Sequence, residues 1–150
     1  MFDVPSVFLP DIMAGHARRW PDKPALICAD ATLNWRDFNA AVCDFARFLM
    51  ARGIGRGDRI AVLAEPTSRA IVVQFGALRA GAGVASLSGM VSGESLSRMI
   101  ADSGAALLVV DDHFAPDLAA ILPAQAADLP LLRITSGPAP EGCLSSDAAL

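Results

Sequence analysis

The best candidates for ligand binding in this chain are small residues that follow a short apolar run. Ser88, Gly89 and Met90 come directly after Val84–Leu87 and precede a helix expected to begin near Ser92. A loop that joins a strand to the amino end of a helix offers backbone N–H groups, and a glycine lets a ligand approach the backbone closely. A phosphate or a pantetheine-like group could lie there. The alternative interpretation is an ordinary connection between a strand and a helix.

Two acidic residues and a histidine close the next apolar run, at Asp111, Asp112 and His113. Two carboxylates at the carboxyl end of a strand could bind Mg²⁺ or accept a phosphoryl group, as in a receiver-like domain. Adjacent residues on an extended chain point apart, however, and a receiver needs a lysine near a later strand end. Lys23 is the only lysine of the chain. We therefore interpret the pair as solvated, with Asp112 capping the following helix.

Two glycine-containing segments resemble phosphate loops but lack their features. Gly53–Gly57 follows a predicted helix and precedes a strand, whereas a phosphate loop follows a strand and opens a helix. Thr135–Gly137 does follow a strand, but Pro138 and Pro140 remove two N–H donors and Glu141 repels phosphate. We predict a turn at each segment.

Histidines and cysteines form no recognisable catalytic or metal-binding pattern. His16 and His113 are the only histidines, and His16 lies on a helical stripe where packing is expected. No serine has the Gly-x-Ser-x-Gly frame of a hydrolase nucleophile. The three cysteines, at positions 28, 43 and 143, are odd in number and lack zinc or redox spacing. This pattern is typical of reduced thiols in a cytoplasmic protein.

The first third of the chain predicts two helices around a small hairpin. The first helix runs from about Pro10 to Arg19, and residues 24–33 form the hairpin, with strands at 25–28 and 32–33 and a turn at Asp30-Ala31. A long helix over 35–52 follows, with Asn34 as its N-cap and Gly53 as its left-handed stop. Its apolar residues recur at helical spacing: Phe38, Ala41, Val42, Phe45 and Leu49.

From residue 59 to 134, apolar runs alternate with helical segments. The runs span 59–63, 84–87, 107–110 and 131–134, and the helices span 68–80, 94–102 and 115–122. Thr67 and Ser92 stand at helix starts, and Gly81 and Gly104 at helix ends. The pattern indicates an α/β fold, a mostly parallel sheet with helical crossovers, preceded by the first helix and the antiparallel hairpin. We expect one subdomain over 1–137, with 138–150 as a linker or truncated sheet edge.

Composition excludes several classes of function. The net charge is −4 and the arginines are scattered, so nucleic acid is not an expected partner. The N-terminus lacks a signal-peptide pattern and no apolar stretch reaches membrane-spanning length, which predicts a cytoplasmic protein without a membrane span. Hydrophobic residues make up 53% of the chain and mean hydropathy is +0.44. Exposed apolar surface and self-association are therefore expected.

Several phrases of the chain, from about Trp20 to Val110, resemble the opening of the adenylate-forming (AMP-binding) superfamily, in particular acyl-CoA synthetases. The phrases are 21–27 (PDKPALI), 32–39 (TLNWRDFN), 55–63 (GRGDRIAVL), 76–82 (GALRAGA) and 102–105 (DSGA). The resemblance implies the first subdomain of the large N-terminal domain of such a ligase. These enzymes make an acyl-adenylate from ATP and a carboxylic acid and usually pass the acyl group to CoA. It also implies a position on the CoA side for Ser88, Gly89 and Met90, although relatives often carry Pro-Leu-Asn-Pro where this chain has Ser86–Gly89.

The resemblance carries no ATP-contacting or catalytic residue onto this chain. The family's phosphate loop begins like Thr135–Gly137 but continues to a lysine, which is missing here, and it falls later in the chain. We therefore expect this chain alone to bind no cofactor and to be inactive, with ATP, Mg²⁺ and CoA used by a parent enzyme of which it is a fragment or natural truncation. Its expected partners are the later layers of the large domain and the C-terminal domain. The alternative is a stand-alone, non-catalytic α/β binding or assembly module.

Overall fold

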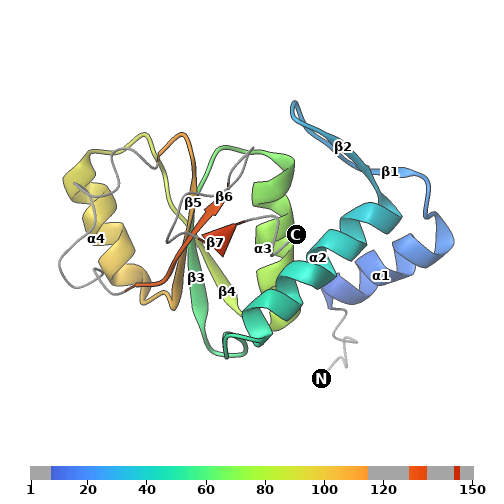
Figure 1. The fold of residues 1–150 in the computed structure, drawn as a ribbon, viewed down its shortest axis with the longest axis horizontal. Helices are drawn as coiled ribbons and strands as arrows, with labels where there is room; N and C mark the ends of the chain where they lie inside the picture. Colours follow the sequence, from blue (N-terminus) through green and yellow to red (C-terminus); the bar gives the residue numbers. More distant parts are fainter. Residues whose placement is uncertain (1–7, 115–128, 135–143, 146–150) are drawn as a thin grey trace, which may run out of the picture.

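The computed structural model describes residues 8–114, 129–134 and 144–145, which form a parallel sheet with helices on both faces and a helix–hairpin unit beside it (Figure 1). The helix–hairpin unit consists of α1 (Leu9–Arg19), the antiparallel strands β1 (Pro24–Ile27) and β2 (Thr32–Asn34), and α2 (Trp35–Met50). The remaining elements are β3 (Arg59–Leu63), α3 (Ser68–Ala80), β4 (Gly83–Ser86), α4 (Gly93–Ser103), β5 (Leu107–Asp111), β6 (Leu131–Ile134) and β7 (Leu144–Ser145).

The sheet has the strand order β4-β3-β5-β6-β7, and every neighbouring pair is parallel. Helices α2 and α3 lie on one face and α4 lies on the other (Figure 1). This arrangement confirms the predicted α/β fold, in which parallel strands are joined by helical crossovers.

The central strands are buried on both faces. Ile60 and Val62 of β3 pack toward α2 and α3, while Ala61 and Leu63 pack toward Leu96 and Ile100 of α4. The same alternation continues on β5. Two-sided burial explains why these strands read as unbroken apolar runs in the sequence.

Local signals in the sequence set the helix ends. Asn34 Oδ1 accepts a hydrogen bond from the backbone N–H of Asp37 at 2.8 Å, and Thr67 and Ser92 cap α3 and α4 in the same way. Gly81 and Gly104 end α3 and α4 with φ of 87° and 56°, in the left-handed region that favours glycine. These caps were predicted from the sequence.

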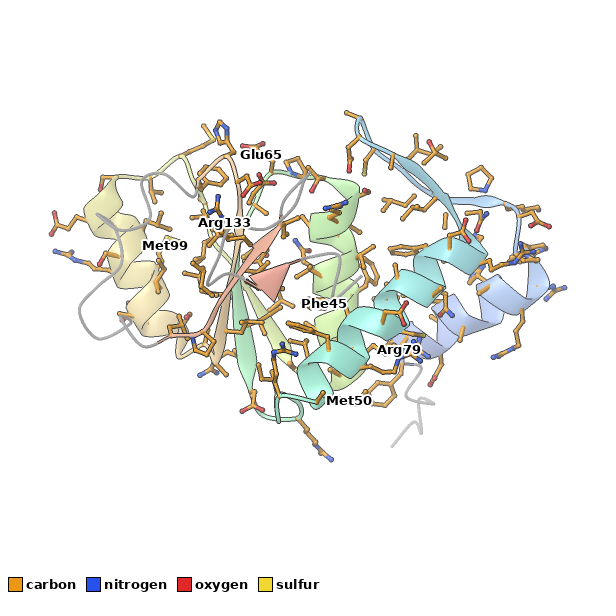
Figure 2. The ribbon with its side chains drawn as sticks, in the orientation of Figure 1. Phe45, Met50, Glu65, Arg79, Met99 and Arg133 are labelled. Atoms are coloured by element: carbon orange, nitrogen blue, oxygen red, sulfur yellow. The ribbon has the colours of Figure 1, made fainter. Side chains whose placement is uncertain are left out.

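Close packing of α2 on α3 depends on a glycine. Phe45 of α2 is fully buried and lies between the two helices (Figure 2). A Cβ added at Gly76 of α3 would stand 2.8 Å from Phe45 Cδ1 and 3.2 Å from the carbonyl oxygen of Val42. A side chain at this position would therefore push the two helices apart.

Some element boundaries differ from the prediction. Helix α2 ends at Met50 because the N–H groups of Arg52 and Gly53 bond to carbonyls three residues back, as in a 3₁₀ turn. Strand β4 ends at Ser86, one residue earlier than expected, although Leu87 N still donates to the carbonyl of Val62. Strand β7 was not predicted and lies in the stretch interpreted as a linker or sheet edge. The predicted helix 115–122 and the boundary near 137 fall outside the described residues.

Candidate functional site

A hollow of about 360 Å³ opens where β3, β4 and β5 end at their carboxyl termini. This edge is where open parallel sheets bind ligands. Figure 2 labels one residue of the lining, Glu65, at this upper end of the sheet. The described residues that line the hollow come from the ends of the three strands and the loops after them: Ala64, Glu65, Leu87, Ser88, Gly89, Met90, His113 and Phe114.

The loop predicted from the sequence forms one wall of this hollow. Ser88, Gly89 and Met90 connect β4 to α4 and are exposed, and the side chain of Met90 is 98% exposed. The backbone N–H of Met90 donates to Ser88 Oγ at 3.3 Å. The structure therefore brings the three predicted residues together at a hollow, while their role as ligand contacts stays a prediction.

Phe114 also lines the hollow and makes close contact with the loop. A Cβ added at Gly89 would lie 2.2 Å from Phe114 Cε1, so only a glycine admits this ring. The ring of His113 packs edge-on against Phe114, with 4.9 Å between the ring centroids. Phe114 has no signal in the sequence that links it to the site, because Gly89 and Phe114 come from different loops and only the fold brings them together.

The acidic pair after β5 does not form a two-carboxylate site. Asp111 Oδ1 accepts from the N–H of His113 at 3.0 Å, whereas Asp112 Oδ1 accepts from Arg133 Nη2 at 2.8 Å. The side chain of Asp112 is 41% exposed, so it keeps contact with solvent as interpreted, and the ion pair with Arg133 of β6 is an addition that the sequence did not predict. The helix that Asp112 was expected to cap lies outside the described residues. Among the described residues, no three or more His, Cys, Asp or Glu side chains are arranged to hold a metal ion.

A second hollow, of about 290 Å³, lies between the hairpin turn and the start of α3. Asp30 of the turn accepts from Ser68 Oγ at 2.6 Å and from the backbone N–H of Ser68 at 3.0 Å. The hydroxyl of Ser68 is the main cause that lowers the pKa of Asp30, and burial opposes it. A carboxylate of the protein therefore already occupies the amino end of α3.

The remaining candidates have structural roles. Gly55 N donates to Asp58 Oδ2 at 2.8 Å within a turn at the amino end of β3, far along the strand from the hollow. His16 stacks on Trp35 with 4.7 Å between ring centroids, as its helical stripe predicted. Lys23 Nζ lies 5.2 Å from the ring centroid of Trp20. Cys28 and Cys43 are free thiols, and Thr135–Gly137 and Cys143 lie outside the described residues.

Comparison with known proteins identifies the family. The model of the AMP-binding enzyme family matches residues 13–148, and the chain therefore belongs to that family. A fatty acid–[acyl-carrier-protein] ligase, ScoC, of Streptomyces coeruleorubidus is 29% identical over 67% of this chain and 20% of its own length. A long-chain-fatty-acid–CoA ligase of Salmonella typhimurium is 29% identical over 77% of this chain and 22% of its own length.

Solved structures confirm the fold. A crystal structure provisionally assigned as a long-chain-fatty-acid CoA ligase from Rhodopseudomonas palustris superposes with a TM-score of 0.85 at 22% identity, covering 96% of this chain and 36% of that one. The N-terminal domain of FACL13 from Mycobacterium tuberculosis gives a TM-score of 0.73 at 23% identity, covering 93% of this chain and 33% of that one. The chain thus spans about a fifth to a third of these ligases.

Within the described residues, none of the helices is both long enough and apolar enough to cross a bilayer.

Proposed function

We propose that this chain is the N-terminal subdomain of a cytoplasmic, ATP-dependent acid–thiol ligase. Such an enzyme joins a carboxylic acid to AMP and then transfers the acyl group to a thiol, with CoA as the acceptor and fatty acids as one class of acid. The observation that carries the proposal is the family match over residues 13–148, together with relatives that activate fatty acids. ATP and Mg²⁺ belong to the complete enzyme.

In this proposal, the chain supplies scaffold and the acceptor side of the site. The described residues do not fit a bound triphosphate, because the single lysine lies against Trp20 and the amino end of α3 holds the Asp30 carboxylate. The hollow beside Ser88–Met90 is open and lies at the sheet edge where ligands bind. We therefore assign this hollow to the thiol acceptor.

The proposal is tested by reading the coding sequence beyond the codon of Leu150 and assaying its product. We expect it to encode a Thr/Ser- and Gly-rich loop that ends in lysine. The encoded protein should release pyrophosphate from ATP only when a carboxylic acid is present. The 150-residue chain alone should release none. A stop codon directly after Leu150, or pyrophosphate release by the short chain alone, would contradict the proposal.

A further inference from the structure

A third hollow, of about 430 Å³, opens where β3, β5 and β6 begin, at the edge of the sheet opposite to the loop Ser88–Met90. Figure 2 labels Met50 at this lower end of the sheet and Glu65 at the upper end. Sites for small molecules have volumes of roughly 300–1,000 Å³ and combine apolar walls with a few polar groups. The residues that line the hollow have this composition: Arg52, Gly53, Ile54, Asp58, Ala106, Leu107 and Pro130.

The apolar part of the hollow is held in place by the core and by backbone hydrogen bonds. Ile54 and Leu107 belong to the buried cluster between the sheet and α2. Ile54 N donates to the carbonyl of Leu49 at 3.0 Å, and the carbonyl of Pro130 accepts from Leu108 N at 2.9 Å. Because these bonds fix the walls, a ligand can bind here with little ordering of the protein.

A cation at the rim has donors that the protein does not use. The guanidinium carbon of Arg52 lies 3.6 Å from the ring centroid of Phe48, and its Nη1 donates to the Phe48 carbonyl at 3.2 Å. These contacts hold the side chain at the end of α2. Within the described part of the chain, Arg52 forms no ion pair. Its other N–H groups therefore remain for a ligand, and a guanidinium binds a carboxylate with paired N–H donors.

A carboxylate lines the same hollow and is not paired with that cation. Asp58 Oδ2 accepts from the N–H of Gly55 at 2.8 Å, which fixes the side chain in the turn before β3. No hydrogen bond or ion pair between described residues joins Asp58 to Arg52. An anion in the hollow would be attracted by Arg52 and repelled by Asp58, and a cation would meet the reverse. A ligand with one group of each sign would complement both side chains.

From this arrangement we infer that the hollow at the amino ends of β3 and β5 binds a free amino acid with an apolar side chain. Arg52 binds the carboxylate of the ligand, and Asp58 binds its ammonium group. The side chain of the ligand lies against Ile54, Ala106 and Pro130. The inference goes beyond the proposed function, because it adds a ligand at the edge of the sheet opposite to the acceptor side.

The test is an NMR titration of the ¹⁵N-labelled chain at neutral pH with L-leucine and three analogues that each lack one of its groups. Isocaproate lacks the ammonium group, isoamylamine lacks the carboxylate, and glycine lacks the apolar side chain. We expect leucine to shift the amide signals of Gly53, Ile54 and Leu107 with a dissociation constant of about 1 mM or lower. Each analogue should bind at least about tenfold more weakly. The amides of Ser88–Met90 should not respond.

Three variants assign the two charged contacts. Arg52→Gln should weaken leucine binding about tenfold and remove the preference for leucine over isoamylamine. Asp58→Asn should weaken it similarly and remove the preference over isocaproate, while the asparagine oxygen still accepts from the N–H of Gly55. Arg56→Gln is the matched control, because it removes the same charge from an exposed residue outside the lining, and it should leave leucine binding unchanged.

Three results would overturn the inference. The first is binding of isocaproate or isoamylamine to the wild type as tightly as leucine, because one charged contact would then suffice. The second is an equal loss of leucine binding in Arg56→Gln and Arg52→Gln, which would show an effect of net charge alone. The third is a titration in which leucine leaves the signals of Gly53, Ile54 and Leu107 unchanged. None of these results bears on the pyrophosphate assay, so the proposed function is judged separately.

Discussion

Two phenylalanine rings in this protein lie against glycines, and the surroundings give the two contacts different consequences. Phe45 lies against Gly76 inside the buried α2–α3 packing, where the Val42 carbonyl also stands 3.2 Å from the position of a Cβ (Figure 2). Phe114 lies against Gly89 at the rim of the hollow beside Ser88–Met90, where it is half-buried on the α4 side of the sheet. In the first region, neighbours on every side fix the ring. In the second, the ring borders open space, so its contact can shape a site without holding the fold together.

The buried contact should show the largest effect on stability. Gly76→Ala would place a methyl group 2.8 Å from Phe45 Cδ1, and neither the ring nor the helix backbone has room to move. We expect the free energy of unfolding to fall by about 1–3 kcal/mol, the usual cost of overpacking a core. Urea denaturation followed by circular dichroism measures it.

The matched control for that variant is Gly15→Ala in α1. A Cβ added at Gly15 meets no atom within 4 Å, and alanine favours the helix. The free energy of unfolding should therefore rise by about 0.5–1 kcal/mol. If both alanines had the same effect, the packing of Gly76 on Phe45 would have no special role and the comparison would fail.

The Asp30→Ala variant tests whether a partly exposed residue of the hairpin turn stabilises the fold. The carboxylate ties the hairpin turn to the first turn of α3, and its loss should lower the free energy of unfolding by about 0.5–2 kcal/mol, as for other helix caps. Because Ser68 lowers the pKa of Asp30 in the folded state, the stabilisation is full above its ordinary value of 3.8 and is lost as pH falls through the lowered value.

Unfolding of the wild type and Asp30→Ala is therefore compared at neutral pH and at about pH 3. The difference in unfolding free energy between the two proteins should shrink at the lower pH. A difference that stays constant with pH would show that the charge of Asp30 has no part in the cap.

Gly89→Ala should disturb the hollow more than the fold. The methyl group would lie 2.2 Å from Phe114 Cε1, but this is the far end of a side chain at the rim, which can swing outward. We expect less than about 1 kcal/mol of destabilisation together with NMR shifts at the loop and a weakened interaction with pantetheine. The double variant Gly89→Ala/Phe114→Ala should recover the stability of Phe114→Ala alone. If Gly89→Ala lowered the free energy of unfolding by more than Gly76→Ala does, the rim contact would stabilise the fold more than the buried contact, which is the opposite of what we expect.

The sequence predicted the fold well because its signals are local. Apolar runs marked the strands, and Asn34, Thr67 and Ser92 marked helix starts, since each cap bonds an N–H only three residues away. The site was predicted only in its loop. Phe114 against Gly89 and Asp30 on Ser68 join different elements, so neither contact has a periodic or nearby sequence signal. These contacts can be recognised only once the fold has brought the two elements of each pair together.

The smallest effect is expected from the ion pair between Asp112 and Arg133, next to the Phe114 turn. The two side chains are 41% and 23% exposed, and water screens pairs of this kind. We expect a coupling energy of about 0.2–1 kcal/mol from a double-mutant cycle with Asp112→Asn and Arg133→Gln, measured by urea denaturation. A coupling above about 2 kcal/mol would instead place this rim among the stabilising parts of the molecule, because exposed pairs rarely reach that value. The contrast between a rigid buried contact and an adaptable rim would then no longer hold.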